Sequence, residues 1–171
     1  MNKQIKTDCL VLAPMTEKDE QAMVDILTND EIKQTYMVPD YDERAKVVAL
    51  FERIKAISNT DGRFCVGIYK EDNLIGFMNE TGVEGETIEI GYVIHPSHKN
   101  NGYATEALKA AMTELFERGY NVIRAGFFEE NIASRRVMEK AGMIKIDMTE
   151  DIEYRGKTHH CIYFEVKNNE K

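Results

Sequence analysis

The segment that most constrains this chain is a hydrophobic stretch, 88–94, which runs into a short polar loop and then into an amphipathic helix. The loop ends in Gly102-Tyr103-Ala104, where small residues let the backbone approach a ligand closely. The first N–H groups of a helix have no internal partner and carry partial positive charge. Strand, loop and helix start together predict an anion site, and a phosphate-bearing cofactor is the first candidate ligand. Gly102 alone would serve a simple turn equally well.

The helix after this loop is predicted over 104–118 by the spacing of its apolar residues. These residues recur on one helical face and are Ala104, Ala107, Leu108, Ala111, Met112, Leu115 and Phe116. Gly119 stands where a glycine commonly ends a helix. A strand is expected next, at 122–128, so the helix is a crossover between two strands. Helical crossovers join parallel strands, and a parallel pair is therefore expected here.

The stretch Lys99-Asn100-Asn101-Gly102-Tyr103-Ala104 resembles the acetyl-CoA motif of the GNAT superfamily of N-acetyltransferases. That motif reads Arg or Gln, two residues, Gly, one residue, then Gly or Ala, and the following Thr-Glu-Ala-Leu is typical of the RimJ/RimL-like branch. Lys99 departs from the motif, because lysine keeps the charge but lacks the planar fork of arginine. The resemblance implies that the cofactor phosphates are bound by Lys99, Asn100, Asn101, Gly102, Tyr103, Ala104 and Thr105.

A second segment, 131–143, resembles the next GNAT motif, which is Asn-x-x-Ser/Ala followed by a short helix and Lys-x-Gly-Phe. Asn131 is also a good helix N-cap and Gly142 a good helix stop, so a helix is predicted over 133–141. A plain capping role remains the alternative for Asn131. The resemblance, which covers roughly 88–166, implies that the cofactor is also bound by Asn131, Ser134 and Arg135. Arg135 and the next arginine point in different directions on a helix, so only one is expected to face the phosphates.

The remaining elements follow from turn residues and apolar patterns. Strands are expected at 9–13, 64–69, 74–79, 143–148 and 158–166, helices at 16–27 and 42–57, and turns at 82–85 and 155–156. The chain is expected to form one N-acetyltransferase domain, 1–171, of the α/β (α+β) class, with a mixed, mostly antiparallel sheet and helices on both faces. The GNAT resemblance implies that the fourth and fifth strands, 88–94 and 122–128, splay apart. It also implies that the pantetheine arm of the cofactor bonds there to backbone groups of Tyr92, Val93 and Ile94, like an added half-strand.

Acetyl transfer to an amine needs a group that accepts a proton, because only the neutral amine attacks the thioester. Glu89 is the candidate base, since it alternates with Ile88 and Ile90 and so leaves the core face of its strand. GNAT enzymes often use a glutamate on this strand, while a solvated strand residue is the alternative for Glu89. The backbone N–H of Val93, at the expected splay, is the candidate for holding the tetrahedral oxyanion.

The group that would protonate the leaving thiolate is the clearest departure from the family. Many GNAT enzymes carry a tyrosine seven residues after the motif asparagine, and this chain has Met138 there, which cannot donate a proton. The RimJ/RimL-like branch often has a serine at the position of Ser134, whose hydroxyl is the alternative donor. A capping role for Ser134 is equally open. A thiol with a pKa near ~8.5 also leaves fairly easily without help.

Composition excludes several classes of protein. The 171 residues include 43% hydrophobic and 30% charged residues, which fits a soluble globular protein of one domain. The net charge of −8 and the lack of a Lys/Arg stripe disfavour nucleic-acid binding, and an acidic surface favours a cationic substrate. No apolar run approaches the ~20 residues of a membrane span, and no secretory signal is recognised at the N-terminus.

The cysteines and histidines do not have the spacing of a metal site. Cys9, Cys65 and Cys161 lie in separate apolar or β-like runs, so buried thiols and a cytoplasmic location are expected. His159 and His160 are neighbours in an expected strand and should therefore point to opposite faces. No bound metal is expected.

These features predict an acetyl-CoA-dependent N-acetyltransferase that acts on a primary amine. A peptide or ribosomal-protein N-terminus is the acceptor that the RimJ/RimL-like branch implies, and a small amine such as a polyamine or a drug is its rival. The alternatives are a non-catalytic acyl-CoA sensor, which only Met138 supports, and a structural domain with an accidental motif. The acceptor side is expected in segments 28–40, 77–86 and 150–158. The sequence leaves open whether the protein forms a homodimer.

Overall fold

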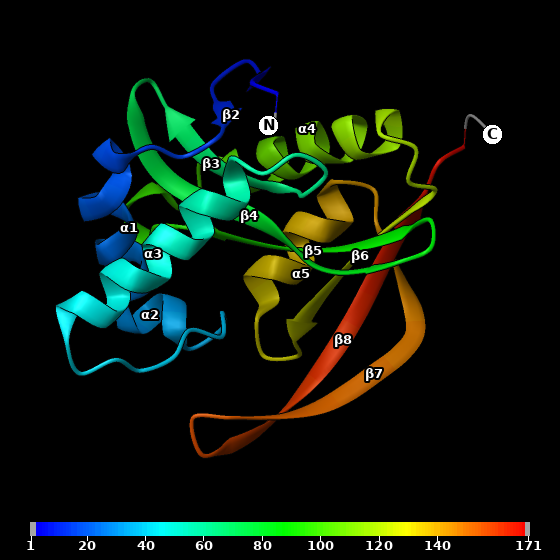
Figure 1. Ribbon diagram of the computed structural model, residues 1–171. Helices are drawn as coiled ribbons and strands as arrows, with labels where there is room; N and C mark the ends of the chain where they lie inside the picture. Colours follow the sequence, from blue (N-terminus) through cyan, green and yellow to red (C-terminus); the bar gives the residue numbers. More distant parts are fainter. Residues whose placement is uncertain (1–2, 170–171) are drawn as a thin grey trace. The chain divides into compact units, whose positions relative to one another are not determined.

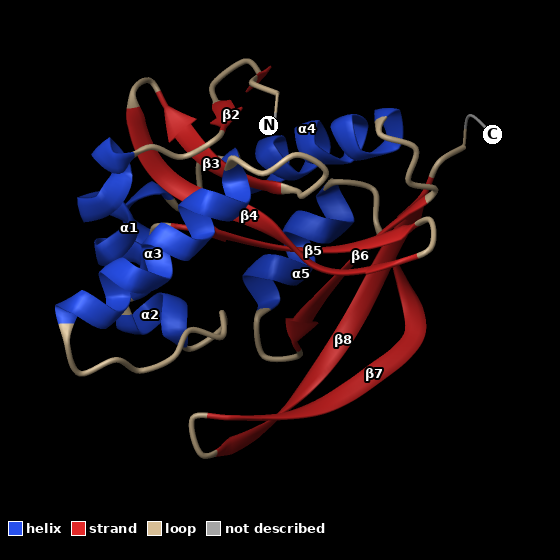
Figure 2. Ribbon diagram, in the orientation of Figure 1, coloured by secondary structure: helices blue, strands red, loops and turns tan. Residues whose placement is uncertain are grey.

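The computed structural model describes residues 3–169, and Figures 1 and 2 show its helices and strands. In chain order they are β1 (Ile5–Lys6), β2 (Val11–Ala13), α1 (Glu20–Leu27), α2 (Asp30–Lys33), α3 (Arg44–Ser58), β3 (Cys65–Lys70), β4 (Asn73–Glu84), β5 (Thr87–Ile94), α4 (Tyr103–Glu117), β6 (Val122–Phe128), α5 (Ile132–Lys140), β7 (Ile144–Tyr154) and β8 (Lys157–Lys167). Short 3-10 helices, Glu17–Asp19 and Pro96–His98, precede α1 and α4. The strands are hydrogen-bonded in the order β1-β2-β3-β4-β5-β6-β8-β7, and the sheet is mostly antiparallel with β5 and β6 parallel.

The described residues form two compact units. The first comprises 3–79 and 92–103, and the second comprises 80–91 and 104–169. Both β4 and β5 run from one unit into the other. The prediction of one N-acetyltransferase domain over 1–171 stays a prediction.

The core of the first unit is built by α1 and α3, which contact each other, and by β3, which contacts α3. Met23, Ile26 and Phe51 are almost completely buried and belong to one apolar cluster with Phe77 and Val93 of the strands. The apolar spacing predicted these helical faces. Burial of a large apolar side chain contributes about 1.5–3 kcal/mol, so this cluster holds the helices to their strands.

In the second unit, β6 pairs with β8 from Val122–Lys167 to Phe128–Cys161, and β7 forms a long hairpin with β8. Helix α5 contacts β6. The predicted apolar face of α4 is buried at Ala107, Leu108, Ala111, Met112 and Leu115. Ile88 and Ile90 of β5 are buried and Glu89 between them is half-buried, which confirms the predicted alternation.

The predicted strand–helix–strand unit of β5, α4 and β6 is confirmed. Strand β6 has the predicted bounds, α4 differs from the predicted helix by one residue at each end, and β5 and β6 are parallel. Gly119 has a φ of 99°, and the N–H groups of Gly119 and Tyr120 bond to the carbonyls of Phe116 and Leu115, so this glycine ends α4 as predicted.

Two predictions near the N-terminus were wrong. Cys9 is exposed and lies in a bend, and the strand begins only at Val11. The reason is local, because the Thr7 hydroxyl bonds to both the carbonyl and the N–H of Leu10 and turns the chain. Thr16 caps a 3-10 turn rather than α1 itself, since the Asp19 carboxylate accepts from the Thr16 N–H at 2.7 Å.

Three further elements differ from prediction. Helix α2 was missed, and Asn29 starts it by accepting from the Ile32 N–H. Gly82 lies inside β4 and not in a turn, because Gly85, with a φ of 58°, makes the reversal. Strand β7 extends beyond 148 to Tyr154 because 149–154 pair with β8. The acceptor-side segments 77–86 and 150–158 are therefore mostly strand.

Candidate active site

The loop between β5 and α4 is shaped by its own backbone and by neighbouring side chains. Asn100 and Gly102 both have left-handed backbone, with φ of 61° and 78°. A Cβ on Gly102 would meet nothing within 4 Å, so glycine is required there for conformation and not for space. Asn101 Nδ2 donates to the carbonyls of His98 and Lys99 at 3.1 and 2.9 Å. Helix α4 begins directly after the loop, at Tyr103, and the first N–H groups of a helix lack partners within the helix.

Two lysines lie near this loop in the first unit. Lys99 forms an ion pair with Glu31 of α2, a contact that the sequence did not reveal. Both side chains are about half exposed, and exposed pairs of this kind are weak, so Lys99 can exchange Glu31 for another anion. Lys70 Nζ lies 5.7 Å from the ring centroid of Tyr103, the first residue of α4. Sequence reasoning missed Lys70 because it lies at the end of a distant strand.

The three β5 residues predicted to bind pantetheine lie at the end of their strand. Val93 is buried, and a Cβ on Gly76 of β4 would come within 2.1 Å of its carbonyl oxygen, so β4 approaches β5 closely there. On its other side, β5 pairs with β6 only from Thr87–Val122 to Glu89–Arg124. The splay predicted for these two strands stays a prediction. The roles of Tyr92, Val93 and Ile94 remain predictions.

The start of α5 brings together two of the predicted residues. The Asn131 side chain accepts from the Ser134 N–H at 3.1 Å and donates to the Ser134 hydroxyl at 3.0 Å. The capping role of Asn131 is therefore real, and its second bond, from Nδ2, orients the Ser134 hydroxyl. Arg135 is exposed and pairs with Glu139 one turn along the helix at 3.0 Å. Met138 is buried in the core, and its thioether has no proton to donate.

Glu89 lies on one face of the second unit's strands. Its carboxylate accepts from the Thr81 hydroxyl at 3.0 Å. Across the strands the same row continues with Arg124 and Glu165. Both Nε and Nη2 of Arg124 donate to one Glu165 oxygen, at 2.8 and 2.6 Å, so the arginine is committed to Glu165 and not to Glu89. Glu89 is half-buried, as a proton acceptor at a reaction site should be.

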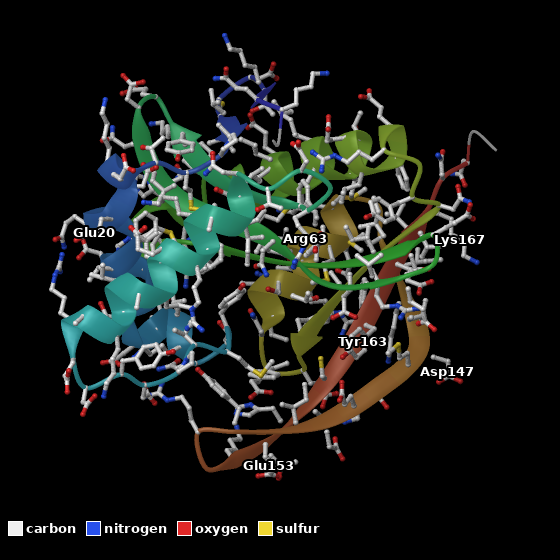
Figure 3. The ribbon with its side chains drawn as sticks, viewed as in Figure 1. Glu20, Arg63, Asp147, Glu153, Tyr163 and Lys167 are labelled. Carbon is white, nitrogen blue, oxygen red and sulfur yellow. The ribbon has the colours of Figure 1, made fainter. Side chains whose placement is uncertain are left out.

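The same face continues with residues that the sequence did not indicate. We call it the Glu89 face and define it by Glu89, Arg124, Gly126, Glu150, Cys161, Tyr163 and Glu165. The Tyr163 hydroxyl donates to Glu150 at 2.9 Å, and Figure 3 shows Tyr163 over β8. Burial and this hydrogen bond raise the pKa of Tyr163, so its hydroxyl keeps its proton. Burial likewise raises the pKa of the Cys161 thiol.

Of the candidate metal ligands, His159 is buried and His160 exposed, which confirms that they face opposite ways. His159 Nδ1 lies 2.5 Å from Glu130, and its ring stacks on Phe128. Within residues 3–169, no three His, Cys, Asp or Glu side chains are placed to hold a metal ion. Cys65 and Cys161 are buried as predicted. Across the same residues, no helix is long and apolar enough to span a membrane.

Comparison with known proteins gives matches over most of the chain. Residues 10–144 match the acetyltransferase (GNAT) domain family. An uncharacterized N-acetyltransferase of Bacillus subtilis strain 168, YnaD, is 35% identical over 141 residues, which are 81% of each chain. A second from the same organism, YoaA, is 27% identical over 97% of this chain and 98% of its own.

Solved structures share the fold. A GNAT-family acetyltransferase from Bacillus anthracis has a TM-score of 0.83 at 24% identity, covering 96% of this chain and 98% of its own. RimL, a ribosomal-protein alpha-N-acetyltransferase solved in complex with coenzyme A, has a TM-score of 0.87 at 17% identity and covers 99% of this chain and all of its own.

Proposed function

Because this chain belongs to the GNAT family of N-acetyltransferases, we propose that it transfers an acetyl group from acetyl-CoA to the α-amine of a peptide or protein N-terminus. The observation that carries the cofactor assignment is the loop before α4, where the left-handed Gly102 turns the backbone into the start of a 15-residue helix. Helix starts of this kind bind phosphate groups through backbone N–H groups and the helix dipole. The acceptor assignment is supported by the fold shared with RimL.

The residues of the loop would hold the cofactor phosphates, and backbone groups of 92–94 would hold the pantetheine arm. Asn131, Ser134 and Arg135 would complete the contacts from α5. The charge beside the loop also suits an anionic ligand such as acetyl-CoA, since Lys70 and Lys99 place positive charge there in an otherwise acidic protein. When bound, acetyl-CoA supplies the activated acetyl thioester.

Glu89 would take a proton from the acceptor ammonium, directly or through water, and leave a neutral amine. The amine nitrogen attacks the thioester carbon, and the Val93 N–H stabilises the tetrahedral oxyanion. The new C–N bond forms as the C–S bond breaks, the nitrogen gives its second proton to water, and CoA leaves as its thiolate. The Ser134 hydroxyl would donate a hydrogen bond to that sulfur, because Met138 has no proton to donate.

The test is calorimetric titration with acetyl-CoA, followed by thiol release with N-terminal peptides and with small amines. Faster turnover of peptides than of polyamines or drug-like amines is the expected result. Preference for small amines would overturn the peptide assignment. Binding without turnover on any amine would favour a sensor, and absence of binding would refute the cofactor assignment.

A further inference from the structure

The Tyr163 side chain is tightly packed on the Glu89 face. Its side chain is only 5% exposed, and it lies opposite Gly126 in the β6–β8 ladder. A Cβ on Gly126 would lie 2.7 Å from Tyr163 Cε1 and 3.1 Å from the Cys161 sulfur. Gly126 therefore leaves the room in which the tyrosine ring lies over β6. A glycine inside a strand weakens that strand, so the space it provides requires an explanation.

The buried ring ends in a hydroxyl that holds an exposed carboxylate. Glu150 is exposed and comes from β7, where it pairs with Cys161 of β8. One of its oxygens accepts from Tyr163, and the remaining lone pairs of the carboxylate are open to a further donor. An exposed glutamate ordinarily samples several rotamers, and ordering it costs up to about 2 kcal/mol of side-chain entropy. The bond to a buried phenol removes part of that cost before any ligand arrives.

We propose that Tyr163 is a positioning residue that fixes the Glu150 carboxylate on the Glu89 face to bind the positively charged amine of the acceptor. This inference rests on the proposed N-acetyltransferase function. An amine reaches the enzyme mainly as its ammonium form, since α-amino groups have pKa values near ~8. Glu150 then binds the ammonium group, while Glu89 on the same face takes the proton that must leave. The Tyr163 phenol touches Glu150 and not the acceptor.

The contact between Arg124 and Glu165 supports the assignment of Glu150 and Glu89 to the acceptor. Arg124 is the cation of the Glu89 face, and it donates twice to Glu165, in its own row. Glu89 and Glu150 are thus the carboxylates of this face that are not paired with a cation among the described residues. A cationic acceptor is the ligand that this arrangement favours.

The experiment measures KM for the acceptor, KM for acetyl-CoA and kcat separately. We expect Tyr163→Phe, which keeps the ring over Gly126, to raise the acceptor KM about three- to tenfold, because the freed Glu150 side chain must then be ordered when the acceptor binds. Glu150→Gln should raise it about tenfold and should abolish its increase with salt. Acetyl-CoA affinity should not change. The double variant should resemble Glu150→Gln, because both act through one carboxylate.

Two controls make the result specific. Asp147→Asn removes a carboxylate from the same strand, where Figure 3 shows Asp147 at the outer side of β7, and should leave the acceptor KM unchanged. Gly126→Ala should reproduce the Tyr163→Phe phenotype by displacing the ring. An unchanged acceptor KM in Tyr163→Phe, or equal effects on acceptor and cofactor, overturns this inference alone. If the wild-type protein releases no thiol with any amine, the proposed function fails and the inference fails with it.

Discussion

The loop before α4 and the Glu89 face are held in place by different means. The loop is fixed by nine consecutive residues, 95–103, through two left-handed backbone positions and short side-chain bonds to its own carbonyls. The Glu89 face is assembled by residues of β5, β6, β7 and β8, which are brought together by pairing between distant segments. The loop therefore depends on local backbone conformation, whereas the Glu89 face is a set of side chains whose positions depend on strand register.

This difference separates the expected effects of substitution. A change in the loop should alter affinity for an anionic cofactor and leave the handling of the acceptor alone. A change on the Glu89 face should act on the acceptor or on proton transfer and leave cofactor affinity alone. A variant that changes cofactor affinity and acceptor handling equally would contradict this separation between the loop and the Glu89 face.

The largest effect is expected from Glu89→Gln. General base catalysis contributes typically about 10²–10⁴-fold, so kcat should fall by that order, while the amide side chain can still accept from Thr81. Calorimetry should show unchanged acetyl-CoA affinity. The matched control is Glu84→Gln, an exposed carboxylate near the end of the preceding strand, which should keep wild-type turnover. Wild-type kcat across the pH range in Glu89→Gln would rule out an essential base at this position.

Gly102→Val should give the next largest effect. A valine at a φ of 78° is strained by roughly 1–2 kcal/mol or more, so the loop will move and acetyl-CoA affinity should fall more than about tenfold. Gly62→Val is a close control, because Gly62 has a φ of 79° and also has nothing within 4 Å of a Cβ. Both variants should lose similar stability in urea denaturation, and only Gly102→Val should lose the cofactor. Equal cofactor affinities in the two variants would refute the phosphate-loop assignment.

The same comparison explains what the sequence could predict. The loop, α4 and β6 were predictable because glycine positions and apolar spacing act over a few residues, and β5–β6 parallel pairing follows from the length of the crossover. Asn131 and Ser134 also fall within four residues of each other. Predictions from local sequence failed where a side chain bonds to the backbone and changes its course. Thr7 does so at Leu10, and Asn29 does so at the start of α2.

The Glu89 face was not predictable beyond Glu89 itself. Tyr163 and Gly126 are 37 positions apart, and only the register of β6 against β8 places them opposite each other. Alternation along β8 would put Tyr163 and Cys161 on one face, but nothing local indicates that Glu150 reaches them across an irregular β7 ladder. Side-chain clusters of this type become visible only when strand pairing is known.

Ser134→Ala tests whether the Ser134 hydroxyl at the start of α5 assists the leaving sulfur or has only a structural role. The bond from the Ser134 N–H to Asn131 survives this change, so stability should remain within about 0.5 kcal/mol of wild type. Loss of a hydroxyl that assists the leaving sulfur should lower kcat about two- to tenfold. Asn131→Ala is the contrasting variant, since loss of the cap should cost about 0.5–2 kcal/mol. If Ser134→Ala keeps full kcat, the hydroxyl has only a structural role.

The smallest effect is expected from Glu130→Gln, and it should depend on pH. Hydrogen bonds to its own backbone and to His159 hold the pKa of Glu130 below its ordinary value of 4.5, so the folded state favours the charged form. This stabilisation is complete above that value and is lost as the pH falls through the folded-state pKa. Urea denaturation at pH 7 should show a loss of about 0.2–1 kcal/mol, the range of exposed pairs, which shrinks steadily below pH ~4.5. The stability loss of Gly102→Val should show no such dependence on pH, because backbone strain does not titrate. A Glu130→Gln difference that stays constant from pH 7 to about pH 3 would mean that shape rather than charge holds this turn.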